Sequence, residues 1–268
     1  IIIGWTDSFS DGGFDFYLIK TDNNGVEQWS QTFGGEYSDQ GLSIDQTLDG
    51  GFILNGNTNT GTGGLIYLIK TDESGVEEWS QTYDQGIGGN EVQQTTDGGY
   101  IIVGNDSGWG DEGSVVLIKT DENGIEQWSQ TFGGIEENYG SFVQQTTDGG
   151  YVITGYTSSY GSGGYDCYLI KTDENGIEQW SQTFGGTELD MGNEVQQTID
   201  GGYIITGHTM SFGNGELDVF LVKTDDNGTE QWSQTFGGTG NDNGTSVKQT
   251  TDGGYLITGS TNSFGDTE

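Results

Sequence analysis

The sequence has no proline and no arginine, and it holds a single cysteine and a single histidine among 268 residues. Because Cys167 cannot form an internal disulfide, the cysteine content does not indicate a redox compartment. Six lysines face 42 acidic residues, for a net charge of −36. Phosphate contacts need Lys and Arg, so we expect no nucleic-acid partner. Such an acidic excess suits an extracellular or cell-surface protein in a cation-rich medium.

Long apolar runs are also missing. None approaches the roughly 20 residues that cross a bilayer, so no membrane insertion is expected. Neither an initiator Met nor a signal peptide is present, and the chain opens in mid-pattern with "IIIGWTDSF". We therefore expect a mature form or a fragment of a longer protein.

Aromatic and β-branched residues are plentiful and regularly spaced, with 7 Trp, 13 Tyr and 12 Phe. Disordered chains combine high charge with few aromatics, which is not the composition here. Ile, Val, Tyr, Phe and Trp suit pleated, half-buried surfaces, and no helical periodicity is found. The composition predicts a folded all-β protein.

The chain repeats itself. The stretch "KTDENGIEQWSQTFGG" occurs at 119–134 and again at 171–186, and near copies begin at Lys20, Lys70 and Lys223. One Trp marks each copy, and five "DGG" turns share the period of about fifty residues, which is typical of solenoids, propellers or arrays. These five tryptophans are Trp29, Trp79, Trp128, Trp180 and Trp232.

One repeat contains four short strand-like runs, "EVQQT", "YIITG", "YLIKTD" and "IEQWSQTF". The turns "TDGG" and "ENG" supply the positive φ that tight hairpins need. Four antiparallel strands in a repeat of this length predict a β-propeller blade, with the first run innermost and the last outermost. The two tight turns then lie on one face and the variable loops on the other.

The stretch "WSQTFGGTGNDNGTSVKQTTDGGYLITGSTNSF" at 232–264 resembles the bacterial β-propeller repeat family labelled SBBP. The resemblance extends over the whole chain and implies a propeller fold in a surface protein. A weaker similarity links "KTDENGIEQW" to the tryptophan-docking motif of quinoprotein dehydrogenase propellers. It implies a Trp packed between blades without the quinone chemistry, so we expect no organic cofactor.

Counting first strands predicts four complete blades, which start near Leu42, Glu91, Phe142 and Glu194. The N-terminal residues supply three further strands and 245–259 supply two. We predict a single domain, 1–268, of five repeats of about 51 residues, closed into a five-bladed ring by the N- and C-terminal strands.

Ring closure at five blades would make Lys248 and Asp45, each exceptional at its position, neighbours. Against it, "IIIG" and "LITG" compete for one strand position. A longer propeller therefore remains the alternative.

Residues present in every blade are expected to be structural. The five repeated lysines are predicted to pair with the Glu before "QW" instead of forming an anion-binding ring. The "TDENG" turns are too short for an EF-hand and are expected to bind no metal.

Two aspartates vary together among the repeats. Both are present in three blades and absent from the other two. Carboxylates that meet repel each other unless a cation or backbone N–H groups neutralise them. We therefore predict small Ca²⁺ sites, with separate capping of each loop as the alternative. The pairs are Asp15/Asp39, Asp166/Asp190 and Asp218/Asp242.

The position after the Gly of "IITG" changes from repeat to repeat, and aromatics with Asn neighbours on a polar face suit sugar binding. The alternative is that loop aromatics only plug the blade ends. The predicted ligand-binding residues are Trp5, Asn57, Asn105, Tyr156, His208 and, in a nearby loop, Trp109.

No nucleophile–base pair, zinc spacing or phosphate loop is evident around His208 or Cys167, so an enzyme is not expected. The sequence predicts a non-catalytic binding module that recognises a glycan or a surface protein. The alternative is a structural or adhesive spacer of a larger surface protein.

Overall fold

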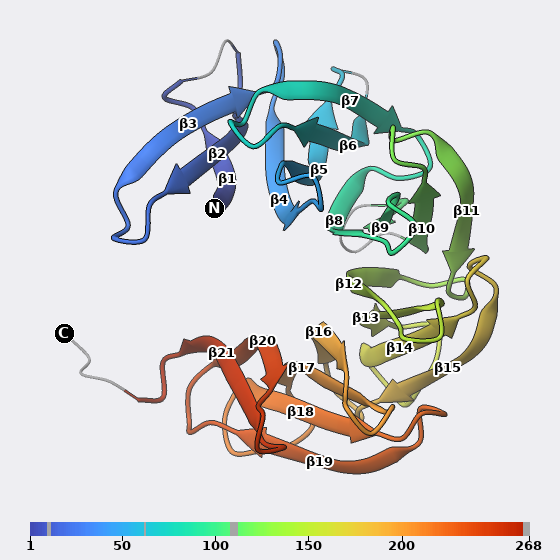
Figure 1. Ribbon diagram of the computed structural model, residues 1–268. Coiled ribbons are helices and arrows are strands. Elements are labelled where there is room, and N and C mark those ends of the chain that lie inside the picture. Colours follow the sequence, from blue (N-terminus) through green and yellow to red (C-terminus); the bar gives the residue numbers. More distant parts are fainter. Residues whose placement is uncertain (10–11, 62, 108–111, 265–268) are drawn as a thin grey trace. The chain divides into compact units, whose positions relative to one another are not determined.

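The computed structural model describes residues 1–9, 12–61, 63–107 and 112–264 (Figure 1). Every regular element among them is a β-strand. The prediction of an all-β fold is confirmed. None of these residues belongs to a helix long and apolar enough to span a bilayer.

The chain divides into two compact units, the first formed by Ile1–Trp109 with Ser114–Thr131. Its sheets have the orders β1-β2-β3, β4-β5-β6-β7 and β8-β9-β10-β11. The strands are β1 (Ile2–Thr6), β2 (Asp15–Thr21), β3 (Glu27–Phe33), β4 (Asp39–Gln46), β5 (Phe52–Asn59), β6 (Gly64–Thr71), β7 (Glu77–Tyr83), β8 (Gly88–Gln94), β9 (Tyr100–Asn105), β10 (Val115–Thr120) and β11 (Glu126–Phe132).

The second unit is formed by Gly110–Gly113 with Phe132–Glu268. Its sheets have the orders β12-β13-β14-β15, β16-β17-β18-β19 and β20-β21. The strands are β12 (Asn138–Gln145), β13 (Tyr151–Thr157), β14 (Asp166–Thr172), β15 (Glu178–Phe184), β16 (Asp190–Gln197), β17 (Tyr203–Thr209), β18 (Asp218–Thr224), β19 (Glu230–Phe236), β20 (Asp242–Gln249) and β21 (Tyr255–Thr261).

The four-stranded sheets are antiparallel blades whose strands follow one another in chain order. Four complete blades with a three-stranded and a two-stranded terminal sheet are consistent with a five-bladed propeller, as predicted. Closure into a ring, and a single domain, stay predictions.

The first strand of each blade is longer than predicted. In the fourth blade it begins at Asp190 instead of Glu194, with a bulge between Gly192 and Glu194. A bulge opposes two residues to one, so the strand continues on the N-terminal side of the run "EVQQT" from which it was predicted.

The core lies between neighbouring blades. In the second unit, Phe184 and Leu169 of one blade pack against Tyr203 and Phe220 of the next, all buried. Trp180 covers this cluster, and its ring centroid lies 5.7 Å from that of Tyr203. The repeated Trp therefore packs between blades, as its resemblance to the docking motif implies.

First strands of neighbouring blades are joined by side chains. The Gln144 side-chain oxygen accepts the backbone N–H of Gln197 at 2.7 Å, and Gln196 accepts that of Gln249 at 2.8 Å. Asp45 accepts the N–H of Gln94 in the same way at 2.9 Å. Each bond satisfies a backbone donor on the next blade.

Candidate functional site

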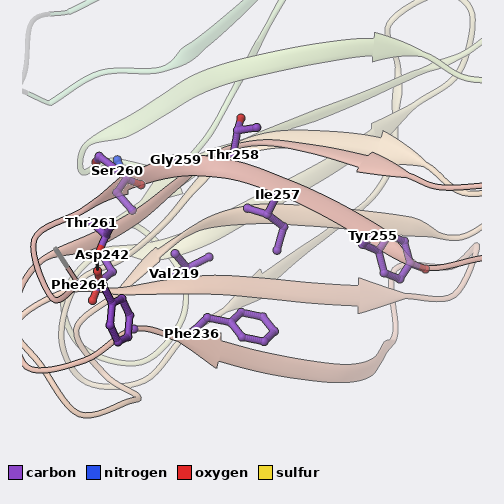
Figure 2. A pocket seen from close by; sticks show the side chains of 12 residues that line it. Val219, Phe236, Asp242, Tyr255, Ile257, Thr258, Gly259, Ser260, Thr261 and Phe264 are labelled. Atoms are coloured by element: carbon purple, nitrogen blue, oxygen red, sulfur yellow. Dashed lines mark hydrogen bonds between the residues drawn. The ribbon is translucent and has the colours of Figure 1, made fainter.

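A groove of about 430 Å³ lies in the second unit beside β21. Its walls come from β18, the end of β19, and β20 and β21. Figure 2 shows Phe236, Val219 and Ile257 around the same space, with Asp242 and Thr261 at one end of it. The lining is mostly apolar, and the groove follows the edge of a two-stranded sheet.

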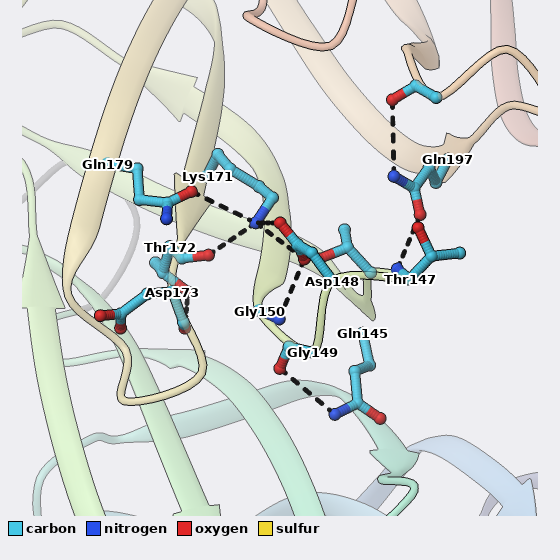
Figure 3. A network of polar contacts seen from close by, with 12 residues as sticks. Gln145, Thr147, Asp148, Gly149, Gly150, Lys171, Thr172, Asp173, Gln179 and Gln197 are labelled. Carbon is cyan, nitrogen blue, oxygen red and sulfur yellow. Dashed lines mark hydrogen bonds and ion pairs between the residues drawn. The ribbon is translucent and has the colours of Figure 1, made fainter.

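At the end of the blade that holds the tight turns, four repeats have the same Lys–Asp pair. Figure 3 shows the pair of Lys171 with Asp148. Lys171 is 3% exposed. Its Nζ donates to the Thr172 carbonyl at 2.7 Å and lies 2.9 Å from Asp148 Oδ2 in the "TDGG" turn. The equivalent pairs are Lys70–Asp49, Lys119–Asp97 and Lys223–Asp200.

These lysines are therefore paired within their own blades. The predicted partner, the Glu before "QW", forms no ion pair with a repeated lysine among the described residues. In the β4–β7 blade, Glu78 stands at the Gln position of "QW" and lies 2.8 Å from Lys70. Elsewhere that position is Gln179 or Gln231. The hydrogen bond from Lys70, helped by Thr47, lowers the pKa of Asp49 to about 2.

The structure brings both members of each aspartate pair to one glycine. A Cβ at Gly185 would clash with the carboxylates of Asp166 and Asp190, and Gly34 and Gly237 meet the other two pairs in the same way. All six aspartates are buried. Burial, together with the charge of Asp190, raises the pKa of Asp166.

Backbone N–H groups already neutralise part of this charge. Asp190 Oδ2 accepts from Gly186 N at 2.7 Å, and Asp166 Oδ2 accepts from Ser162 N at 2.8 Å. The hydroxyls of Thr209 and Ser211 also donate to Asp190. These bonds are those expected of the capping alternative.

The first pair differs. Asp39 Oδ2 accepts from Gly35 N at 2.9 Å, but its Oδ1 is buried and has no hydrogen-bond partner among the described residues. In the third blade Asn138 takes this place, and its Nδ2 donates to the carbonyls of Gly113 and Glu136 at 2.9 and 2.7 Å. No group of three or more His, Cys, Asp or Glu among the described residues is placed to hold a metal ion.

The predicted ligand-binding residues have different surroundings. Trp5 is 49% exposed, whereas Tyr156 is 2% exposed and stacks on Tyr139 at 5.0 Å between centroids. Asn57 is partly buried and accepts the N–H of Gly89, and Asn105 is buried. Trp109 lies outside the described residues.

His208 is partly buried, and its Nδ1 lies 3.0 Å from Asn243 Oδ1. Asn193 Nδ2 donates to the same oxygen at 2.8 Å. Burial lowers the pKa of His208 and so favours the neutral form of its ring. The imidazole and two amides form a polar cluster that occurs once among the described repeats.

Sequence analysis missed Glu137, which is buried and accepts hydrogen bonds from Tyr156 at 3.0 Å and Tyr165 at 2.6 Å. The signal was present in the sequence. Tyrosines stand at three positions of this repeat where the next repeat has Met191, His208 and Leu217. Cys167 is also buried, which raises the pKa of its thiol to about 12 and keeps it protonated.

Comparison with known proteins finds no matching family model. No curated protein matches either.

Solved structures do match. A protein of unknown function from Dyadobacter fermentans is 13% identical with a TM-score of 0.56, covering 90% of this chain and 76% of its own. Sqt1 from Chaetomium thermophilum is 13% identical with a TM-score of 0.52, covering 92% of this chain. The chain spans 59% of the length of Sqt1. Similarities at this identity show the fold alone, an all-β repeat of four-stranded antiparallel sheets.

Proposed function

We propose that this chain is a non-catalytic binding module of the extracellular space or cell surface, built from SBBP-type propeller repeats. Its ligand is a glycan or a surface protein, held at the loop end of the blades. The −36 charge and the sequence pattern at 232–264 support this assignment. No catalytic role is assigned to the single histidine, because Nδ1 of its ring is hydrogen-bonded to Asn243.

One observation carries the proposal. The turn end repeats the same Lys–Asp–Thr contacts in four blades. At the loop end, the residue after the Gly of "IITG" varies among Trp, Asn, Tyr, His and Ser. At equivalent positions of the loop end stand exposed Trp5, buried Tyr156 and the half-buried His208 cluster. Variable residues on a rigid scaffold are the usual arrangement of a binding surface.

A glycan is the ligand to test first, because an exposed indole stacks on sugar rings while amides meet hydroxyls. Purified chain is applied to an array of polysaccharides with and without Trp5→Ala and His208→Ala. We expect loss of binding in at least one of these variants. Ile199→Ala, which lies in a turn at the opposite end, serves as the control and should bind normally. Glycan recognition is contradicted if the chain binds no polysaccharide, or if Ile199→Ala lowers binding as much as the test variants do.

Calcium binding is proposed for the first aspartate pair in particular. Asp39 has a buried carboxylate oxygen to offer, while Asp190 and Asp242 already accept hydroxyl donors at both oxygens. Hard oxygen ligands suit Ca²⁺.

Thermal unfolding with EDTA and with millimolar CaCl₂ tests this site, and we expect calcium to raise Tm by several degrees. Asp39→Asn should remove most of that shift, and Asp242→Asn should leave most of it. An equal shift with Mg²⁺ indicates charge screening instead.

A structural role in a larger assembly is the second candidate function. The groove beside β21 favours it, because an apolar wall next to a free strand edge suits another polypeptide better than a sugar.

A further inference from the structure

Among the described residues, the apolar surface between the end of β19 and β21 is incompletely covered. Phe236, at the end of β19, is 49% exposed, whereas Phe184 at the same position of the preceding blade is 6% exposed. Tyr255 and Ile257 of β21 are half-buried, whereas their equivalents Tyr203 and Ile205 are buried. The apolar groove lies between these uncovered side chains.

The complete interface shows what is missing from the groove. Between Phe184 and Tyr203, the space is filled by Phe220 and Val222 of β18, the third strand of its blade. The β20–β21 sheet has no third strand. The groove therefore has the shape and chemistry to take a strand with two apolar side chains on one face.

The opposite end of the chain carries such a strand. In β2, Tyr17 and Ile19 stand where β18 has Phe220 and Val222. Tyr17 and Ile19 are half-buried, whereas Phe220 and Val222 are 3% and 0% exposed. This apolar face of β2 is as incompletely covered as the groove.

The charges match as well. Each of the other four repeated lysines pairs with the "TDGG" aspartate of its own blade at 2.8–3.0 Å. Lys20 of β2 makes no ion pair with any described residue and instead donates to the Glu73 carbonyl at 3.3 Å. Asp252, in the turn between β20 and β21, bonds Thr250 and the N–H of Gly254, with no lysine beside it.

The edge of β2 that pairs with β1 can pair with β21 instead. β1 pairs with β2 over five residues, and its Ile2 and Trp5 are exposed. In a complete blade, β17 pairs with β18 over seven residues, Tyr203–Thr209. β21 has the same seven-residue length, so it offers two more pairs to β2 than β1 does.

We propose that the β20–β21 sheet of one copy of this chain binds the β2–β3 hairpin of a second copy, in place of the ring closure within one chain that the repeat count predicts. β21 takes the place of β1 on the edge of β2, and Tyr17 and Ile19 of the second copy fill the groove. Lys20 of the second copy pairs with Asp252. The contact is head-to-tail, so repetition produces an open chain or a closed ring of copies. Because β1 carries Trp5, the exchange also moves one of the residues proposed to bind a glycan.

Sedimentation equilibrium of the full chain over a range of concentrations tests the proposal. We expect species larger than the monomer that grow with concentration, and more so at high salt, because each copy carries −36. Ile257→Asp should weaken association tenfold or more. The same change at Ile199, which is 85% exposed and outside the groove, should not.

Exchanging the charges of Lys20 and Asp252 tests the same contact even if Ile257→Asp disturbs the β20–β21 sheet. Lys20→Glu should weaken association about fivefold, and adding Asp252→Lys to the same chain should restore it. Circular dichroism confirms that each variant is folded. A monomer at every concentration and salt, or association that Ile199→Asp reduces as much as Ile257→Asp, would overturn the proposal.

Discussion

Glycines at equivalent turn positions differ in how closely they pack against neighbouring side chains. Gly228 closes the turn before β19 with a φ of 78°. A Cβ there would also meet the Trp180 ring of the preceding blade. Gly25 has the same turn position and a φ of 79°, but nothing lies within reach of a Cβ. The two positions separate backbone strain from packing.

Replacing Gly228 by Ala should destabilise the protein more than replacing Gly25. Both variants have the cost of a left-handed residue, about 1–2 kcal/mol. Gly228→Ala adds overpacking against Trp180, a further cost of about 1–3 kcal/mol. Urea unfolding followed by tryptophan fluorescence measures both. An equal loss of unfolding free energy in the two variants would show that the Trp180 ring shifts at little cost.

The Lys70–Asp49 pair makes stability depend on pH. In the folded chain the pKa of Asp49 is lowered from 3.8 to about 2. The carboxylate form is favoured by folding, so its contribution is present above about pH 4 and is lost as pH falls toward 2. Asp49→Asn should therefore lose less stability than the native chain over that range. Identical pH dependence of their unfolding free energies would contradict this role.

At the scale of elements, the strands follow local rules and the links between blades do not. The strand-like runs between the turns "TDGG" and "ENG" predicted second, third and fourth strands close to their observed bounds. Those signals lie within a few residues of each other. The Gln144 side chain and the Gln197 backbone are 53 residues apart, so no local sequence pattern could predict their hydrogen bond.

Gln144→Leu should destabilise the second unit by about 1 kcal/mol, because it leaves the N–H of Gln197 without its acceptor. Lys248→Leu is the matched control. Its side chain has the equivalent place on β20 but no oxygen with which to accept. Denaturant unfolding of the two variants measures the difference. A control as destabilised as Gln144→Leu would mean that packing, and not the hydrogen bond, matters here.

The candidate site was predictable in its composition but not in its contacts. The variation of Asp166 with Asp190 correctly placed the two together, because residues that change together are often in contact. The three tyrosines of this repeat signalled a distinct cluster, but the bond of Tyr156 in β13 to Glu137 depends on how β13 pairs with β12, 19 residues earlier.

At the scale of the whole molecule, the net charge acts against stability. A charge of −36 on 268 residues opposes compaction by self-repulsion. Added NaCl should raise Tm progressively, because the Debye length falls from about 10 Å at 0.1 M to about 3 Å at 1 M. Differential scanning calorimetry across a salt series measures this. A Tm that is flat or falls with salt would show that local ion pairs such as Lys171–Asp148 outweigh the repulsion.

The sequence by itself determined the all-β class, the four-stranded repeat, the turn positions and the acidic surface, since these depend on composition and on neighbours within one hairpin. Only the tertiary structure decided that each buried Lys meets the "TDGG" aspartate and that the aspartate pairs converge on a glycine. It also decided that Phe236 and Ile19 are left incompletely covered. Lys171 and Asp148 are 23 positions apart within one blade, and the exposure of Phe236 depends on what packs against the end of its blade, so neighbouring letters determine neither. Repeated letters with the same local preferences therefore acquire different surroundings.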